Sequence, residues 1–563
     1  MKVIIVGGVA GGATAAARIR RLNEHAEITV FERSGYISYA NCGLPYYIGD
    51  VITDPEELTL QTPESFFKRF RINMKIHHEV ISIHPERKTV SVKNLENGEI
   101  FEEKYDKLIL SPGAKPTQPR LPGVGMDKLF TLRTVEDTFR IKEYINKNHP
   151  KSAVLAGGGF IGLELAENLR ELGIDVTIVQ RPKQLMNPFD PDMASMIHNE
   201  MRKHGIKLVL GYTVEGFKEK DTGVEVLLKD NPSLQADMVV LAIGVTPDTV
   251  LAKEAGLELG IKESIVVNDR METSVPDIYA AGDAVQVKHY VTGNDALISL
   301  AGPANKQGRI IADNICGGDS RYLGSQGSSV IKVFDMTAAT TGINETNAKK
   351  SGLEVDTVIL SPMSHAGYYP GGKVMTMKVV FEKETYRLLG AQIIGYEGVD
   401  KRIDVLATAI HAGLKATQLK DLDLAYAPPY SSAKDPVNMA GFMIDNIAKG
   451  TLKQWHLEDM DKISRDKSVV LLDVRTVGEF NRGHMDGFKN IPVDELRERI
   501  NEIEKGKPVY LICQSGLRSY IASRILEGNG YETYNFSGGF RFYDAVVNDR
   551  ALIEKAYACG MDY

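Results

Sequence analysis

The chain has 563 residues, of which 43% are hydrophobic and 25% charged, a composition typical of a globular protein with three or four domains. Its net charge of -7 offers no basic surface for a nucleic acid, and no apolar run is long enough to span a membrane. The cysteines are too scattered for a disulfide scaffold or a metal site, which favours a cytoplasmic protein without a metal. They are Cys42, Cys316, Cys513 and Cys559.

The first segment predicts a strand over residues 3–6, a glycine turn over residues 7–12 and a helix over residues 13–22. This pattern fits a buried βαβ unit better than a signal peptide. A second strand ends at Glu32, 20 positions after Gly12, where an acidic residue would bind a ribose hydroxyl. Two glycine registers fit the turn, one through Gly8 and Gly11 and one through Gly7 and Gly12, and both stay open.

The same pattern returns about 150 residues later as strand 153–156, the turn GGGFIG at residues 157–162, a helix and strand 176–179. One such motif is weak support for a cofactor site, but two in the same frame predict two dinucleotide sites. In both, bare N–H groups at a helix start would meet a pyrophosphate. At the end of the last strand a Glu at position 180 would favour NADH, and an arginine near the 2′-phosphate would favour NADPH. Gln180 removes the repulsion of an acid and Arg181 is either a phosphate ligand or a surface charge, so we expect NADH with NADPH possible.

Three further features lie in the first 283 residues. Residues 38–46, SYANCGLPY, hold Cys42 without a second cysteine at the spacing of a redox pair. On the first helix Thr14, Arg18 and Arg21 share a stripe that would either bind phosphates or face solvent. Asp283 follows a strand that ends in Ala-Ala-Gly, so it is either a helix N-cap or a ligand of a flavin ribityl chain.

The C-terminal part predicts an antiparallel sheet near residues 330–394, a helix over residues 401–412 and then a separate module. In that module Cys513 directly follows a predicted strand. It begins a six-residue loop that ends at Arg518, and a predicted helix comes next. Loop N–H groups and the helix dipole would stabilise a sulfur anion. A phosphatase loop is one residue longer, so the shorter loop favours a sulfurtransferase.

Residues 1 to about 450 resemble the pyridine nucleotide–disulfide oxidoreductase family, and most of all its coenzyme A-disulfide reductase branch. The motifs that carry this resemblance are residues 38–46 and the segment AYAPPY at residues 425–430. The last hundred residues resemble a single-domain rhodanese. The resemblance implies an α/β fold with two Rossmann-like domains, an α+β dimerisation domain and an α/β rhodanese domain. The expected limits are 1–110 and 245–324 for the FAD-binding domain, 111–244 for the NAD(P)-binding domain, 325–448 for the dimerisation domain, 449–460 for a linker and 461–563 for the rhodanese domain.

The resemblance also implies FAD, NADH (with NADPH possible) and coenzyme A (CoA) as cofactors, and a homodimer whose active site the partner subunit completes. Cys42 would form a mixed disulfide with CoA, and tyrosines would serve as acids. The expected catalytic residues are Cys42, Cys513, Tyr426, Tyr368, Tyr369 and Arg518. The expected FAD and nicotinamide ligands are Gly7, Gly8, Ala10, Gly11, Gly12, Glu32, Arg33, Val80, Ser111, Gly113, Gly157, Gly159, Phe160, Ile161, Gly162, Glu164, Gln180, Gly244, Asp283, Pro303 and Ala304. The expected CoA contacts are Thr14, Arg18, Arg21, Ser38, Asn41, Arg71, Asn305 and Lys434.

These features predict a reductase of CoA disulfide, CoA persulfide or polysulfide, in which the rhodanese domain handles sulfane sulfur on Cys513. One alternative is an NADH oxidase or peroxidase that cycles a cysteine sulfenic acid. Those relatives carry a histidine where this chain has Ala10. A second alternative is a non-catalytic sulfur carrier or redox-sensing scaffold, against which the intact nicotinamide motif argues.

Overall fold

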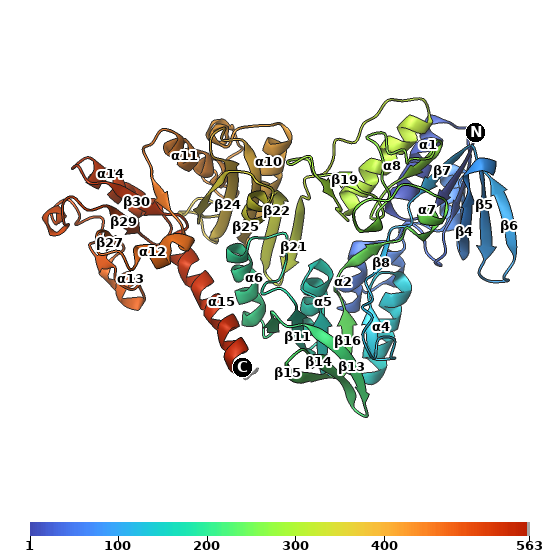
Figure 1. Cartoon of the computed structure of the whole chain (residues 1–563), viewed down its shortest axis with the longest axis horizontal. Helices are drawn as coiled ribbons and strands as arrows, with labels where there is room; N and C mark the ends of the chain where they lie inside the picture. Colours follow the sequence, from blue (N-terminus) through green and yellow to red (C-terminus); the bar gives the residue numbers. More distant parts are fainter. Residues whose placement is uncertain (560–563) are drawn as a thin grey trace. The chain divides into compact units, whose positions relative to one another are not determined.

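The computed structural model describes the backbone of residues 1–559 and the side chains of residues 1–555. The chain forms two compact units, Met1–Pro182 with Gly205–Gly327, and Lys183–His204 with Ser328–Tyr563 (Figure 1). None of the helices that the structure describes is both long and apolar enough to cross a membrane.

The first parallel sheet of the N-terminal unit is built from short apolar strands. Its central strand is fully enclosed, with Val3, Ile4 and Ile5 at 0% exposure, as expected for a sheet covered on both faces. Helices α1 (Ala10–Leu22) and α8 (Ala301–Ile315) pack closely against each other. The strand order is β18 (Ile278–Ala280), β7 (Lys107–Leu110), β1 (Lys2–Val6), β2 (Glu27–Phe31) and β3 (Asn73–Lys75).

A second parallel sheet repeats this plan, with helices α4 (Val135–Asn148) and α5 (Phe160–Glu171) beside it. Its strand order is β12 (Lys207–Leu210), β11 (Asp175–Gln180), β10 (Ser152–Ala156), β16 (Met238–Leu241) and β9 (Leu129–Thr131).

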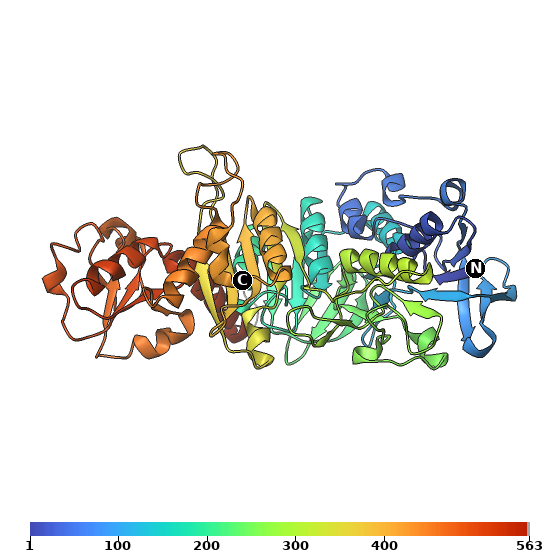
Figure 2. The ribbon, with the colours of Figure 1, turned by 90° about the horizontal axis from the view of Figure 1, so that it is seen from above.

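Antiparallel ladders complete the N-terminal unit, and the shortest of them pairs β19 (Val287–Lys288) with β20 (Asp295–Ala296). The crossover ladder pairs β8 (Ala114–Pro116) with β17 (Val245–Pro247). One three-stranded sheet, β4 (His78–His84), β5 (Thr89–Asn94) and β6 (Ile100–Lys104), lies beside the N-terminus (Figure 2). The other contains β13 (Val214–Lys220), β14 (Gly223–Leu228) and β15 (Asn231–Ala236).

The C-terminal unit begins with a five-stranded antiparallel sheet, as the sequence predicted. Helices α9 (Glu345–Lys350), α10 (Val399–His411) and α11 (Pro436–Ala448) accompany it. The strand order is β21 (Ser329–Val333), β22 (Met336–Gly342), β25 (Leu388–Gly395), β24 (Met375–Glu382) and β23 (Val355–Leu360). Helix α6 (Pro191–Lys203) belongs to the same compact unit, although its sequence lies inside the expected NAD(P)-binding domain.

The last sheet is parallel and belongs to the C-terminal module. It carries helices α13 (Val477–Arg482), α14 (Leu517–Glu527) and α15 (Gly539–Cys559). Its first strand lies inside the stretch that the sequence suggested as a linker, and Trp455 there is 2% exposed and donates to the Leu511 carbonyl at 3.3 Å. The strand order is β26 (Gln454–Trp455), β30 (Thr533–Phe536), β29 (Val509–Ile512), β27 (Val470–Asp473) and β28 (Lys489–Asn490).

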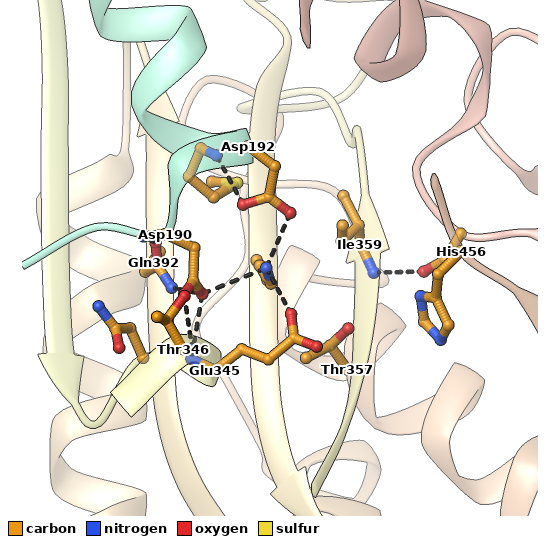
Figure 3. Close-up of polar contacts among 12 residues, drawn as sticks. Asp190, Asp192, Glu345, Thr346, Thr357, Ile359, Gln392 and His456 are labelled. Atoms are coloured by element: carbon orange, nitrogen blue, oxygen red, sulfur yellow. Dashed lines mark hydrogen bonds and ion pairs between the residues drawn. The ribbon is translucent and has the colours of Figure 1, made fainter. Parts of the chain in front are cut away.

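A buried lysine joins α6, the antiparallel sheet and α9 within the C-terminal unit. The ammonium of Lys378 on β24 lies 3.2 Å from Asp190, 2.8 Å from Asp192 and 2.8 Å from Glu345. Figure 3 shows the three carboxylates turned toward this ammonium, with Gln392 donating to Asp190 at 2.6 Å. Burial alone would raise the pKa of Asp190 and Glu345, but Lys378 and hydrogen bonds hold both below their usual values.

Replacing Lys378 by Met should destabilise the chain by about 3–5 kcal/mol at pH 7, because buried Asp190 and the partly buried Asp192 and Glu345 lose their counter-ion. In the native chain these lowered pKa values give stability that is lost as pH falls through them. In the variant, burial raises the pKa of the carboxyls. The free energy of unfolding should therefore increase as the pH falls from 7 to 5. Urea unfolding midpoints at the two pH values measure both effects.

The matched control is Lys349→Met, because Lys349 pairs with Glu345 at 2.5 Å from an ammonium that is about half exposed. A pair whose ammonium is open to solvent contributes about 1 kcal/mol or less. Equal losses in the two variants would contradict the role assigned to the buried lysine.

Gly308 on α8 allows the close approach of α1, because a Cβ there would lie 2.4 Å from the Gly11 carbonyl oxygen. Gly308→Ala should therefore lower the free energy of unfolding by about 1–3 kcal/mol. Gly478→Ala on α13 is the control, since the nearest atom to a Cβ at that exposed position is 3.9 Å away. A Gly308→Ala chain as stable as the control would show that the two helices can separate without cost.

Candidate active site

The first glycine turn leaves no room for side chains at two positions. Gly7 has φ +95°, and a Cβ there would lie 2.1 Å from the Ser111 carbonyl oxygen. A Cβ at Gly12 would lie 2.0 Å from the Gly7 carbonyl oxygen. The carboxylate of Glu32 accepts from the Gly8 N–H at 2.9 Å and fixes the turn to the end of β2.

The second turn repeats this geometry at equivalent positions. Gly157 has φ +120° and would carry a Cβ 2.2 Å from the Ala242 carbonyl oxygen, while one at Gly162 would lie 2.2 Å from the Gly157 oxygen. The side-chain oxygen of Gln180 accepts from the Gly158 N–H at 3.1 Å, as Glu32 does for Gly8. No atom lies within 4 Å of a Cβ at Gly159, so the start of α5 is open to an approaching phosphate.

Three segments meet at the edge of the first sheet, where the sequence predicts the flavin site. A Cβ at Gly11 would lie 2.8 Å from the Ser111 hydroxyl and 3.3 Å from the Cβ of Ala281. The start of α1, the segment after β7 and the loop after β18 therefore converge. Asp283 lies in this loop, and Arg133 donates to its carboxylate at 3.0 Å. Burial raises the pKa of Asp283, and Arg133 opposes that effect.

Cys42 lies in the short helix η1 (Asn41–Gly43), directly before α2 (Leu44–Ile48), which packs on α4 and α5. Its side chain reaches solvent, but enough protein surrounds the thiol for desolvation to raise its pKa. The charges that act on the thiol are Glu164 and Asp283, which raise its pKa, and Arg133, which lowers it. The structure therefore brings Cys42, Glu164 and Asp283 together.

Glu164 on α5 stands out among the carboxyls near Cys42. Burial, together with the neighbouring charge of Glu167, raises its pKa to about 7. A carboxyl with such a pKa gains and loses a proton near neutrality, as general acids and bases do.

The expected CoA residues of the N-terminal unit fall into two groups, one on α1 and α8 and one near Cys42. The hydroxyl of Thr14 donates to Asn305 at 2.5 Å, and Arg18 pairs with Asp313 at 2.8 Å. Arg21 is exposed on the same helix. Ser38 adopts φ +46°, and its N–H donates to the Gly8 carbonyl at 2.9 Å, which links the Cys42 segment to the first turn. The guanidinium of Arg71 lies 5.2 Å from the ring of Phe67.

The other expected cofactor residues come from several segments of the N-terminal unit. Arg33 pairs with Asp248 at 2.8 Å, and Val80 is buried in the core under the first sheet. A Cβ at Gly113 would lie 3.2 Å from the Arg133 guanidinium. The remaining positions are Ala10, Phe160 and Ile161 at helix starts, Pro303 and Ala304 in the first turn of α8, and Gly244 at φ +111°.

The expected tyrosines lie on the C-terminal unit. The hydroxyls of Tyr368 and Tyr426 are 2.6 Å apart, and this hydrogen bond raises the pKa of Tyr426. Tyr368 is 76% exposed and Tyr369 43%. Lys434 is exposed as well.

The loop after β29 encloses a second sulfur. The Sγ of Cys513 accepts from the Gly516 N–H at 3.1 Å and from the Ser519 hydroxyl at 3.2 Å, and the residue is 1% exposed. Arg518 donates twice to Glu479 at 2.7 Å, and this pair lowers the pKa of Glu479 to about 2. The loop thus supplies the donors that a sulfur anion needs.

Sequence patterns did not point to Arg133, Glu479 or Ser519. Arg133 follows β9 without a motif, and only the folded chain brings it to Asp283. Glu479 is 39 residues from Arg518, which itself was expected at the sulfur. Ser519 directly follows Arg518, which is the one sequence signal that would have suggested it. Cys316 closes α8, and the side chain of Cys559 lies outside the described residues.

A family model described as Pyridine nucleotide-disulphide oxidoreductase matches residues 1–308. The chain belongs to this family. The dimerisation domain of the pyridine nucleotide-disulphide oxidoreductases matches residues 328–436, and a Rhodanese-like domain matches residues 456–545.

Individual relatives cover most or all of the chain. A coenzyme A disulfide reductase of Staphylococcus aureus is 38% identical over 78% of this chain and 99% of its own length. The structure of a reduced CoADR-RHD of Bacillus anthracis is 48% identical, has a TM-score of 0.95 and covers 98% of both chains. An NAD-dependent persulfide reductase from A. fulgidus is 38% identical, with a TM-score of 0.90 over 96% of this chain and 100% of its own. These findings confirm the predicted resemblance and the α/β fold class, while the individual site residues stay predictions.

Replacing Glu164 by Gln should lower the pKa of the Cys42 thiol, because a neighbouring negative charge is removed. At pH 8, where Glu164 is ionised, the variant should react several-fold faster with iodoacetamide, since the thiolate is the nucleophile. Alkylation of Cys42 followed by peptide mass spectrometry across pH 6–10 measures the shift.

Glu171→Gln is the matched control, because Glu171 is exposed at the end of the same helix. An unchanged pH profile for Glu164→Gln would mean that the carboxyl does not act on the Cys42 sulfur.

Proposed function

We propose that this protein reduces CoA disulfide, CoA persulfide or polysulfide with electrons from NADH, and that its rhodanese domain handles sulfane sulfur. The observation that carries the proposal is the placement of Cys42. Its free, desolvated thiol lies in electrostatic range of Glu164, Arg133 and Asp283, and no described cysteine forms a disulfide with it. A single thiol at such a site needs its second sulfur from the substrate.

Pyridine nucleotide-disulphide oxidoreductases use FAD and NAD(P)H, and both glycine turns of this chain fit such dinucleotides. When bound, FAD would take a hydride from the nicotinamide and supply an electron pair for the S–S bond. The turn at Gly7–Gly12, with Ser111 and Asp283, would hold FAD. The turn at Gly157–Gly162 would hold the nicotinamide cofactor. NADH is the expected form, and the neutral Gln180, which does not repel a 2′-phosphate, allows NADPH.

The chain's own groups supply the thiol and a proton. Cys42 would attack the CoA-linked sulfur and hold CoA as a mixed disulfide. Glu164, with a pKa of about 7, can hold a proton at its carboxyl close to this thiol. Arg133 is a positioning residue, because its guanidinium fixes Asp283 and the carbonyl of Ala114 at 3.0 Å each.

The CoA end of the substrate would bind beside α1. Ser38 and Asn41 flank Cys42, and exposed Arg21 is available to a phosphate. Thr14 and Asn305 contact each other on the facing helices α1 and α8. Arg18 already has Asp313 as its partner, so a phosphate would have to share it.

We also propose a homodimer in which the partner subunit completes the active site. The match to the family's dimerisation domain and the exposed pair Tyr368 and Tyr426 support this arrangement. A tyrosine hydroxyl can donate to a departing CoA thiolate.

The free thiols of Cys42, Cys316 and Cys513 favour the cytoplasm, where thiols stay reduced. The domain limits given above and Lys434 as a CoA contact complete the proposal.

The NADH oxidase alternative is weaker, because a CoADR-RHD and a persulfide reductase each match this chain over almost its whole length. The scaffold alternative leaves the two dinucleotide turns and the enclosed Cys513 sulfur without a purpose.

Two substitutions separate the two sulfur centres. Cys42→Ser should reduce NADH oxidation with CoA disulfide by about 100-fold or more, because no mixed disulfide can form. It should leave sulfur transfer from thiosulfate to cyanide intact. Cys513→Ser should do the reverse, losing sulfur transfer and keeping reduction of CoA disulfide. Anaerobic assays of NADH absorbance and thiocyanate formation measure both.

Cys316→Ser serves as the control for substitution of a cysteine outside both sites. Full CoA disulfide reduction by Cys42→Ser would overturn the proposal. Rapid NADH consumption in air without any CoA substrate would support the oxidase instead.

A further inference from the structure

The rhodanese domain carries a surface pocket away from the loop that holds Cys513. Its volume is about 610 Å³, within the range of small-molecule sites. One wall is a face of α14, the helix that follows the Cys513 loop, and the other comes from residues 497–500. The lining residues are Arg497, Ile500, Tyr520, Ile521, Arg524, Ile525, Gly528 and Asn529.

Two guanidinium groups give this pocket its chemistry. Arg497 is exposed and makes no ion pair or hydrogen bond within the part of the chain that the structure describes. Arg524 uses one nitrogen, Nη1, to donate to the Thr451 carbonyl at 2.8 Å and to the Glu527 carboxylate. A guanidinium has five N–H donors, so both arginines have donors left for a phosphate.

The rest of the lining suits a heterocycle and an aliphatic chain. Tyr520 offers an aromatic ring for stacking, and Ile500, Ile521 and Ile525 offer apolar surface. A site with two arginines, a ring and aliphatic side chains favours a phosphorylated nucleotide over a small inorganic sulfur donor, which has no apolar part.

Two exposed apolar side chains lie between this pocket and the loop that holds Cys513. Leu517 and Ile521 are 65% and 43% exposed and lie one turn apart on α14. Leu517 directly follows Gly516, whose N–H donates to the Cys513 sulfur. The rise from Leu517 to Arg524 is about 10 Å along the helix. A pantetheine arm has a chain of about twelve atoms, equal to about four residues or roughly 13–14 Å when extended.

We propose that this pocket binds the nucleotide end of CoA, with the pantetheine arm along Leu517 and Ile521 and its sulfur at Cys513. The inference rests on the proposed function, because it assumes that CoA carries sulfane sulfur. It adds a second CoA site, on the rhodanese domain, to the one beside α1. The α1 site serves reduction, and the α14 site serves sulfur exchange.

The exchange at this site is a thiol–persulfide transfer without net oxidation. The thiolate of Cys513 attacks the outer sulfur of CoA persulfide, and a new S–S bond forms to Cys513. The S–S bond of the donor breaks, its electron pair leaves on the CoA sulfur, and the proton of the persulfide goes to that thiolate. The products are CoA thiol and a Cys513 persulfide anion, which the Gly516 N–H and the Ser519 hydroxyl are placed to stabilise. The reverse reaction loads CoA from Cys513.

The test compares two donors that differ only in the nucleotide. Full-length protein with Cys42→Ser is mixed with CoA persulfide or pantetheine persulfide, and the gain of one sulfur atom on Cys513 is followed by mass spectrometry. The half-saturating concentration should be lower for CoA persulfide in this background. Adding Arg497→Glu and Arg524→Gln together should raise it about ten-fold or more for CoA persulfide, because hydrogen bonds to charged groups are lost.

Further variants separate binding from folding. Arg497→Glu alone should show part of the effect, because Arg524 remains. Since the Arg497 side chain makes no other described contact, this variant should fold normally. Lys489→Glu, on the exposed edge strand β28, is the charge-matched control and should change neither donor. Equal half-saturation by the two donors before substitution, or equal losses for both after it, would overturn the pocket assignment.

The outcome also separates this inference from the proposed function. If the wild-type chain reduces CoA disulfide and takes sulfur from thiosulfate, yet shows no preference for CoA persulfide over pantetheine persulfide, only the α14 site is wrong. If Cys513 takes sulfur from no donor, both the site and the sulfur-handling role of the domain fail.

Discussion

The architecture of the N-terminal unit depends on backbone contacts that only glycine permits. In each turn the first glycine adopts a positive φ, and the last would place a Cβ about 2 Å from the carbonyl oxygen of the first. Because strand, turn and helix touch through bare backbone, the N–H groups at the helix start stay free to face a ligand. The chain uses the same contact twice, at Gly7 with Gly12 and at Gly157 with Gly162, so both helix starts have the same backbone geometry.

Two groups of charged side chains, one around Lys378 and one around Cys42, show opposite electrostatics. Around Lys378, one ammonium holds the pKa of Asp190 and Glu345 down, so the charges stay fixed and join three elements (Figure 3). Around Cys42, burial raises the pKa of Glu164 and of the thiol itself, and Arg133 is too weak a counter-charge to reverse this. The first arrangement stabilises a fold, whereas the second leaves one carboxyl, Glu164, ready to exchange a proton near neutrality.

Local motifs were predictable from the sequence because their physical cause is local. The glycine turns, the strands before them and the Cys513 loop all follow from residues adjacent in the chain. The acidic position at Glu32 was also found, but its hydrogen bond to Gly8 was not, and neither was the equivalent bond of Gln180 to Gly158. Contacts such as Arg133 with Asp283 or Arg518 with Glu479 join distant segments, and no sequence period encodes them. The same holds for α6, which packs with α15 and β25 far from it in the sequence.

The two sulfur centres meet the cost of forming a thiolate in different ways. The Cys513 sulfur is enclosed and receives donors from Gly516 and Ser519, so the loop itself stabilises the anion. The Cys42 sulfur has no hydrogen-bond donor within the described residues, and two carboxyls disfavour its charge. Without such donors, its thiolate gains stability only from Arg133 and from what binds beside it. Such a thiol stays protonated and therefore unreactive unless a bound ligand stabilises its anion. This property protects a thiol that is partly open to solvent.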